Sequence, residues 1–227
     1  MKNDIVGHGA YTVADAAQLL QISKARLRRW VSGYTYKIDN QLTAKPALWR
    51  PYYTQFDEKI LSFRDLMEAR YIKAFAAAGV SIRGLRSLLK IAQNLVDDER
   101  PFSTNRFRTD GKTLFLETVN ARGERLLDIK QKQHVFRKIV ERTLLDVDFD
   151  DHAALRWWAA GRTKSIVIDP QIAFGKPVLH GTSIPTSRIA EVAEIEGSIK
   201  QAARLFEIDL ADAKQALAYE KTLARAA

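Results

Sequence analysis

The stretch Tyr11–Trp30, YTVADAAQLLQISKARLRRW, decides the fold of the N-terminal part of the chain. Thr12 is a residue type that caps helices, and apolar residues follow it at helical spacing. Gln21 and Ile22 leave room only for a tight turn, after which Ser23 can cap a second helix. Two short helices joined by such a turn predict a helix-turn-helix motif.

The second of these helices is cationic. Leu27 and Trp30 supply its buried side, and the remaining positions carry Lys24, Arg26, Arg28 and Arg29. In a helix-turn-helix such a helix enters the major groove of DNA. We expect Lys24, Arg26 and Arg29 to face the groove and Arg28 to contact phosphates. A small helical hairpin with a solvated basic face is the alternative interpretation.

The residues after Trp30 favour a β-wing. Gly33 can end the helix, and the following stretch mixes Tyr, Trp and Thr with cations, which suits a hairpin that reaches phosphates beside the groove. An ordinary hairpin that packs its aromatic residues on the helices would share this composition, and we expect Trp49 and Tyr53 to pack. The predicted DNA-binding residues are Thr12, Ser23, Lys24, Arg26, Arg28, Arg29, Tyr34, Lys37, Lys45 and Arg50.

The positive charge is concentrated in this region. Residues 1–100 hold 16 Lys and Arg against 10 Asp and Glu, whereas residues 101–160 hold 11 against 9 and residues 161–227 hold 9 against 8. The net charge of the chain is +9, and most of it therefore accompanies the helix-turn-helix. A polyanionic partner, double-stranded operator DNA, is expected for that end.

Several kinds of chemistry are excluded or disfavoured by the composition. The chain has no cysteine, which removes disulfides, thiolate catalysis and cysteine-ligated metal sites. The four histidines are scattered without metal-ligand spacing, so we expect no enzyme, no metal and no cofactor. An acidic cluster at 146–151 could bind a metal, but carboxylates at strand ends and turns are the favoured interpretation. No apolar run is long enough to cross a bilayer and no signal core is visible, so a cytoplasmic protein is expected.

Two further helices should complete the N-terminal domain. Ser62 can cap a helix over roughly 64–77 after a short strand at 59–63, and Ser81 can cap the next, with Ile82 to Leu95 supplying an apolar face. Val13-Ala14-Asp15-Ala16-Ala17, Leu27-Arg28-Arg29-Trp30, Phe63-Arg64-Asp65-Leu66 and Gly79-Val80-Ser81-Ile82 resemble MerR-type winged helix-turn-helix domains. The resemblance covers about residues 10–95 and departs in a longer wing and in the lack of a following coiled coil.

The middle of the chain, residues 101–160, is expected to bridge two modules. Alternation of apolar and polar residues predicts a β-meander over roughly 105–129. A helix near 133–145 should follow, and then β segments that include Phe149, residues 155–158 and residues 165–168. Nothing in this part indicates chemistry.

The C-terminal part, residues 161–227, carries a second informative pattern. Fixed glycines and prolines in IDPQIAFGKPVLHGTSIP predict a defined loop, and helices are expected at 186–196, 198–206 and 209–224. The last two have helix-turn-helix spacing without excess cations, so a protein-interaction or dimerisation unit is favoured over DNA binding. These residues resemble the DUF 433 family, although Ser183 replaces its usual Arg.

The resemblance to DUF 433 implies an antitoxin that pairs with a PIN-like toxin nuclease. Together with the N-terminal domain it resembles VapB-type antitoxins. The expected partner-binding residues are Phe174, Lys176, Pro177, Ile184 and Arg188.

The predicted fold class is mainly α with small β elements (α+β), in three parts: 1–100, 101–160 and 161–227. We expect a homodimeric antitoxin and autorepressor of a type II toxin-antitoxin pair. A one-component MerR-like transcription regulator with a C-terminal ligand-sensing or dimerisation domain is the alternative. A pure interaction protein, whose helix-turn-helix only dimerises, is a third possibility.

Overall fold

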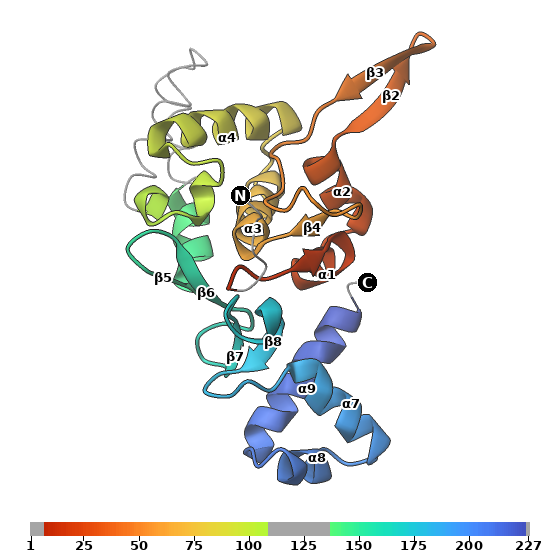
Figure 1. The fold of residues 1–227 in the computed structure, drawn as a ribbon, viewed down its shortest axis with the longest axis vertical. Coiled ribbons are helices and arrows are strands. Elements are labelled where there is room, and N and C mark those ends of the chain that lie inside the picture. Colours follow the sequence, from red (N-terminus) through yellow and green to blue (C-terminus); the bar gives the residue numbers. More distant parts are fainter. Residues whose placement is uncertain (1–6, 109–136, 226–227) are drawn as a thin grey trace.

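The computed structural model describes residues 7–108 and 137–225 of the chain. It has an α+β fold with an N-terminal helix-turn-helix, as predicted (Figure 1). A hairpin projects from one end of the molecule, and a three-helix unit forms the opposite end.

The helix-turn-helix consists of α1 (Val13–Leu19) and α2 (Lys24–Ser32). The Thr12 hydroxyl accepts from Asp15 N–H while the Asp15 carboxylate accepts from Thr12 N–H, which completes a capping box at the start of α1. The Ser23 hydroxyl accepts from Arg26 N–H and caps α2. Between the helices Gln21 has a φ of 51°, so the turn is tight. Both predicted caps are confirmed.

The wing is an antiparallel hairpin of β2 (Tyr34–Ile38) and β3 (Gln41–Lys45). Asp39 and Asn40 form a two-residue turn with φ values of 46° and 64°. Asn and Asp tolerate this left-handed region better than other side chains, and paired positive φ angles match the twist of a hairpin. The predicted wing is confirmed.

The rest of the N-terminal domain packs behind the motif. The short strand β1 (Tyr11–Thr12) pairs antiparallel with β4 (Ile60–Leu61). Two helices follow, α3 (Phe63–Ala77) and α4 (Ile82–Val96), capped by the hydroxyls of Ser62 and Ser81 as predicted. The strand expected at 59–63 is shorter, because the Ser62 cap starts α3 at once. A 3-10 turn, η1 (Pro101–Ser103), packs on α3.

The β-meander predicted from residue 105 is wrong for its first residues. Residues 105–108 are helical, because the Thr104 hydroxyl accepts from Phe107 N–H and so starts a turn. Phe107 is fully buried, with its ring centroid 4.9 Å from that of Phe102 and 5.4 Å from that of Tyr71. Burial of this aromatic residue outweighs the alternating pattern. The remainder of the predicted meander, residues 109–129, lies outside the described residues.

A four-stranded antiparallel sheet follows, in the order β5-β6-β7-β8. Residues 137–145 are helical, in agreement with the predicted helix, whose first residues 133–136 are not among those described. The strands are β5 (Val147–Phe149), β6 (Ala154–Trp158), β7 (Ile166–Ile168) and β8 (Pro177–Leu179). The predicted boundary between the middle and C-terminal parts of the chain is residue 160. Strands β5 and β6 come before it and strands β7 and β8 after it, yet all four belong to one sheet.

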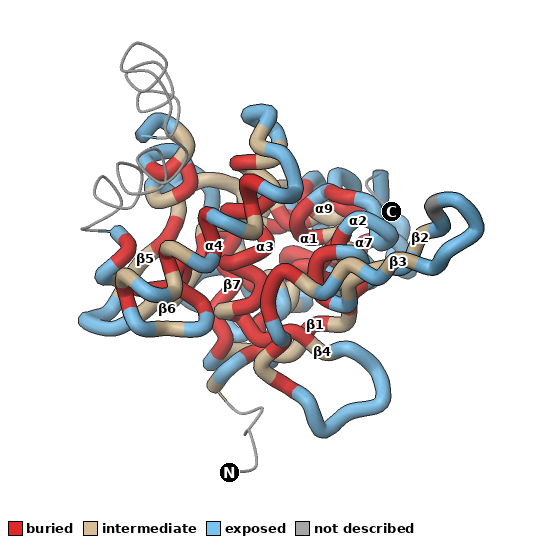
Figure 2. The backbone as a smooth tube through the Cα atoms, turned by 90° about the horizontal axis from the view of Figure 1, so that it is seen from above, coloured by how far each residue is buried: buried red, intermediate tan, exposed pale blue. Residues whose placement is uncertain are grey.

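The three-helix unit has the predicted helices, α7 (Thr186–Ile195), α8 (Ile199–Leu205) and α9 (Leu210–Ala224). Between β7 and β8 the chain makes a 3-10 turn, η2 (Ala173–Gly175). Figure 2 shows buried backbone through the centre of the molecule, while the wing is largely exposed. One buried cluster includes residues of α1, α3, α4, the sheet and α9, so the modules share a continuous core.

Candidate nucleic-acid interface

Helix α2 exposes four cations from one short segment. Leu27 and Trp30 are buried and orient the helix, whereas Lys24, Arg26, Arg28 and Arg29 are all exposed. No acidic residue lies within α2. The helix therefore offers an unopposed positive surface of the kind that double-stranded DNA attracts.

One face of the wing extends this surface. The Arg29 guanidinium lies 5.8 Å from the ring centroid of Tyr34, and the Lys45 ammonium lies 6.0 Å from that of Tyr36. The two tyrosine rings are 5.9 Å apart, and the strand register pairs Tyr34 with Lys45. Arg29 and Lys45 thus flank a pair of tyrosine rings between α2 and the wing, and each cation has a cation–π contact with one ring.

The base of the wing is held against both α2 and α4. Arg86 of α4 donates hydrogen bonds of 2.9 Å to the carbonyls of Pro46 and Ala47, and Leu48 N–H donates to the Trp30 carbonyl at 2.7 Å. Gly33 has a φ of +72°, and a Cβ there would lie 2.9 Å from the Pro46 carbonyl carbon. Only glycine permits this close approach. The wing is therefore anchored to the helix-turn-helix.

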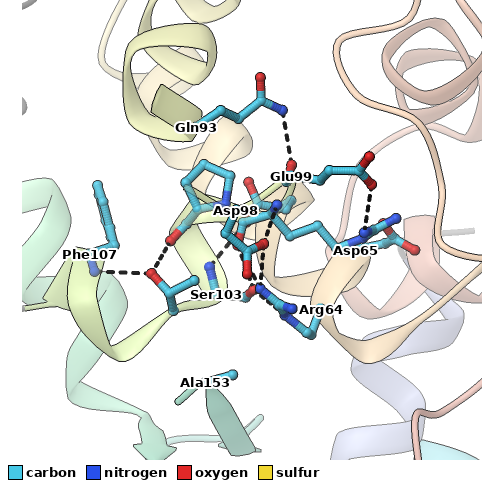
Figure 3. Close-up of polar contacts among 12 residues, drawn as sticks. Arg64, Asp65, Gln93, Asp98, Glu99, Ser103, Phe107 and Ala153 are labelled. Carbon is cyan, nitrogen blue, oxygen red and sulfur yellow. Dashed lines mark hydrogen bonds and ion pairs between the residues drawn. The ribbon is translucent and has the colours of Figure 1, made fainter. Parts of the chain in front are cut away.

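A buried ion pair fixes the segment that follows the wing (Figure 3). Arg100 Nε donates to Asp65 Oδ1 at 2.6 Å, and Trp49 Nε1 donates to the same oxygen at 3.1 Å. The other oxygen, Oδ2, accepts from Tyr52 N–H at 2.9 Å. Arg100 also donates to the Arg50 carbonyl at 2.9 Å. Sequence reasoning placed Trp49 in the core but missed this network, because Asp65 and Arg100 are 35 residues apart.

The structure does not bring all the predicted DNA-binding residues together. Arg50 is exposed, but it lines a groove with Asp97, Asp98 and Glu99, apart from α2. Lys37 is exposed and pairs with Leu42 across the wing.

The hydroxyls of two more predicted DNA-binding residues are used locally. Thr12 and Ser23 each accept a backbone N–H as helix caps. These two hydroxyls therefore stabilise the first turns of α1 and α2.

The predicted partner-binding residues lie on η2, on β8, in the loop after β8 and on α7. Phe174 in η2 has 60% of its surface exposed and a φ of 56°, and Lys176 beside it is exposed. Pro177 and Ile184 are half-buried, and Leu179 N–H donates to the Ile184 carbonyl, which holds that residue near β8. Arg188 is exposed on α7 and forms an ion pair with Glu191.

The acidic cluster at 146–151 has local partners. Burial alone would raise the pKa of Asp148, but hydrogen bonds from Arg162 and Trp158 outweigh it and lower that pKa. Backbone N–H groups of Ala153 and His152 lower the pKa of Asp150. Within residues 7–108 and 137–225 no group of three His, Asp or Glu side chains has a metal-binding arrangement.

Two families of domains match the two ends of this architecture. Residues 9–89 match a family described as "Putative DNA-binding HTH domain". Residues 166–219 match the family described as "Protein of unknown function (DUF433)". The first match spans α1, α2, the wing and α3, and the second spans β7 to α9.

Two relatives match most of the chain, across both of these regions. A protein of Mycobacterium tuberculosis (strain ATCC 25618 / H37Rv) named "Putative antitoxin VapB45" is 27% identical over 197 residues, which are 80% of each chain. The X-ray crystal structure of Rv2018 from Mycobacterium tuberculosis has the same fold, with a TM-score of 0.69 and 19% identity over 96% of this chain and 100% of that one. This protein is thus a homologue of a chain named as an antitoxin.

No helix in the described part of the chain is both long and apolar enough to cross a membrane.

Proposed function

We propose that this protein is the antitoxin of a type II toxin-antitoxin pair, that it represses its own operator and that it neutralises a PIN-like toxin nuclease. One observation carries the proposal: this chain combines a helix-turn-helix and its anchored cationic wing with a DUF433 module. The chain is also a homologue of VapB45. No enzymatic role is proposed, and no cofactor or metal is needed.

On the operator, α2 would lie in the major groove, with Lys24, Arg26 and Arg29 reaching base edges. Arg28 and Lys45 would contact phosphates. Tyr34 would support Arg29, because their side chains are already in contact. The order of helix-turn-helix, wing and two following helices supports a MerR-like mode of docking.

A homodimer is proposed because one short helix reads few base pairs. Two copies on two half-sites multiply the affinity of each. The proposed location is the cytoplasm, where both operator and toxin would be found.

The toxin would dock on the C-terminal module, at the surface formed by Phe174, Lys176, Pro177, Ile184 and Arg188. Exposed Phe174 offers an apolar anchor, and Lys176, two residues further on, offers an exposed charge. Such a combination is typical of a protein-protein contact, where a few aromatic and cationic side chains supply most of the affinity.

The DNA-binding half is tested by mobility shift with DNA from immediately upstream of the coding sequence. Replacing both Arg26 and Arg29 by Ala should weaken the shift, because α2 then loses two cations while Leu27 and Trp30 keep it packed. Lys164→Ala, which removes an exposed cation of the C-terminal part, is the matched control. Unchanged affinity of the double variant at moderate salt would exclude α2 as the recognition helix.

The toxin-binding half is tested by co-expression with the product of the neighbouring gene. The expected result is co-purification and loss of that protein's nuclease activity. Phe174→Ala should weaken the complex, whereas Leu42→Ala, which removes an even more exposed apolar side chain from the wing, should not. A neighbouring gene that encodes no nuclease would favour the one-component regulator instead.

A further inference from the structure

The C-terminal module is docked on the DNA-binding domain, and this contact determines where α9 lies. Ala10 N–H donates to the Phe174 carbonyl at 3.1 Å. The Tyr11 ring lies against Gly175, where a Cβ would be 2.7 Å from Tyr11 Cζ. Helix α9 itself packs on α1, and Leu223 near its end belongs to the buried cluster that both modules share. The last turns of α9 therefore lie beside the helix-turn-helix.

The end of α9 lies on the same side of the molecule as α2 and the wing. Figure 1 shows this end just below α1 and α2, on the side where the wing projects. In Figure 2, seen from above, α9, α2 and the wing again lie on one side. Helix α8 is at the opposite end of the molecule from the wing. A duplex that lies along α2 and the wing would therefore pass near the last turns of α9.

One face of α9 is cationic. Lys214, Lys221 and Arg225 are exposed, and spacings of seven and four residues place them on one side of a helix. Arg225 has helical backbone angles, φ −74° and ψ −17°, so it continues this face. Among the residues that the structure describes, no ion pair involves any of the three. The neighbouring Glu220 carboxylate accepts from the Thr186 hydroxyl of α7 instead.

The nearly even charge balance of this module conceals the local excess. Residues 161–227 hold 9 Lys and Arg against 8 Asp and Glu, but DNA meets a surface and not a sum. Exposed cations attract the phosphate backbone whatever the base sequence. The last two cations of the α9 face, Lys221 and Arg225, lie within the turns that are nearest to the helix-turn-helix.

We propose that Lys221 and Arg225 contact the phosphate backbone of operator DNA beside the groove that α2 enters. The inference rests on the proposed function, whose DNA-binding surface it extends from the N-terminal domain onto the C-terminal module. The turn between α8 and α9 plays no part, because α8 lies at the far end of the molecule. The module thus adds affinity for any duplex and no preference for a base sequence.

The experiment compares two matched pairs of cations in the C-terminal module. Lys221→Gln with Arg225→Gln, the α9 pair, removes the proposed contacts. Lys200→Gln with Arg204→Gln, the α8 pair, removes an exposed Lys and an exposed Arg at the same spacing from the opposite end of the molecule. Gln has nearly the helix propensity of Lys and Arg. Both pairs lower the net charge equally, so only the place of the lost charge differs.

Each full-length variant is titrated over a range of salt concentrations with two labelled duplexes, one from immediately upstream of the coding sequence and one of unrelated sequence. We expect the α9 pair to reduce the slope of log affinity against log salt by about 2. It should weaken the binding of both duplexes by the same factor. The α8 pair should leave the slope and both affinities unchanged. Arg26→Ala with Arg29→Ala should instead weaken binding of the upstream duplex more than that of the unrelated one.

The outcomes separate this inference from the proposed function. If the unmodified protein binds duplex DNA and the two paired variants have equal slopes, the inference alone is overturned. If the unmodified protein binds neither duplex, the operator function fails and the inference fails with it. An α9 pair that binds DNA normally but loses the product of the neighbouring gene would assign these cations to a protein partner and would overturn the inference as well.

Equal urea midpoints of the two paired variants would show that a change in slope does not come from unfolding. Should the α9 pair not fold, Arg225→Gln alone is compared with Arg204→Gln alone. The expected reduction in slope is then about 1 for the first and none for the second. Equal slopes in these single variants would likewise overturn the inference.

Discussion

The two ends of the molecule present opposite kinds of surface. The N-terminal domain holds most of the net charge and displays it on α2 and on a wing anchored by Arg86. The C-terminal module is nearly neutral. Large apolar side chains are exposed at both ends, Phe174, Ile195 and Leu205 in the C-terminal module and Leu42, Phe56 and Ile82 in the N-terminal domain, so charge is what separates the two surfaces. A charged surface attracts its partner at long range and depends on salt, whereas an apolar surface acts only on contact. The difference suggests two partners of different chemistry.

The two ends also differ in which contacts position their surfaces. Behind the wing, a buried ion pair and several hydrogen bonds converge on Asp65. The Phe174 loop is held by the Ala10 hydrogen bond and by its fit to Tyr11. The proposed DNA-binding surface is thus positioned by the interior of its own domain, and the proposed partner surface by contact with the other domain.

The largest expected effect comes from Asp65→Ala, which removes the centre of that network. Arg100 would remain buried without its carboxylate, and Trp49 Nε1 would lose its acceptor. Breaking a buried pair on one side costs about 3–5 kcal/mol of unfolding free energy, to be measured by urea denaturation. Glu141→Ala breaks the exposed pair with Arg137 and is the control, with a loss of about 1 kcal/mol or less. Equal losses of unfolding free energy in the two variants would show that the buried network around Asp65 does not hold the segment that follows the wing.

The next effect concerns the salt dependence of the two surfaces. Each phosphate contact that is lost should reduce the slope of log affinity against log salt by about 0.9. Arg28→Ala and Lys45→Ala together should therefore flatten the slope for duplex DNA by about 2. The affinity for the toxin should depend less on salt than the affinity for duplex DNA, both in the unmodified protein and in the double variant. An unchanged DNA slope in the double variant would remove both residues from the phosphate contacts.

A smaller effect is expected from Glu68→Gln, and it depends on pH. Glu68 is fully buried, and this burial raises its pKa well above the ordinary value, although Ser103 N–H donates to one of its oxygens. The folded protein therefore binds this proton more tightly than the unfolded chain, so stability falls as pH rises above the unfolded pKa of about 4.3. Gln keeps the acceptor for Ser103 and cannot ionise.

Denaturant unfolding at pH 5 and pH 8 checks this prediction. We expect Glu68→Gln to stabilise the protein more at pH 8 than at pH 5, by roughly 1 kcal/mol. Glu99→Gln, at an exposed carboxylate, should show no such difference. If the stability difference between Glu68→Gln and the unmodified protein were the same at both pH values, a raised pKa of Glu68 would be contradicted.

The smallest effect is predicted for Arg50→Ala. Arg50 lines a groove with three acidic residues and lies apart from α2. Its loss should change DNA affinity by less than about 0.5 kcal/mol, against about 1–3 kcal/mol for Arg29 if that residue contacts a base. Fluorescence anisotropy with the same duplex compares the two. A loss from Arg50→Ala as large as that from Arg29→Ala would place the DNA across this groove as well.

The sequence by itself determined the local elements. The caps Thr12, Ser23, Ser62 and Ser81 each start a helix where predicted, and the helices at 186–224 follow the expected pattern. These features depend on neighbours three or four residues away, so spacing alone can reveal them. The charge on α2 is likewise visible from the sequence, although the roles of its residues remain predictions.

Only the tertiary structure decided which distant residues meet. The turn at 105–108 is helical because Phe107 is buried among aromatic rings, and Arg50 lies beside acidic residues rather than with α2. The Asp65–Arg100 pair and the Tyr11–Gly175 contact join residues 35 and more positions apart. Such contacts depend on how the elements pack, and a periodic pattern records which side of a helix or strand is buried but not against what.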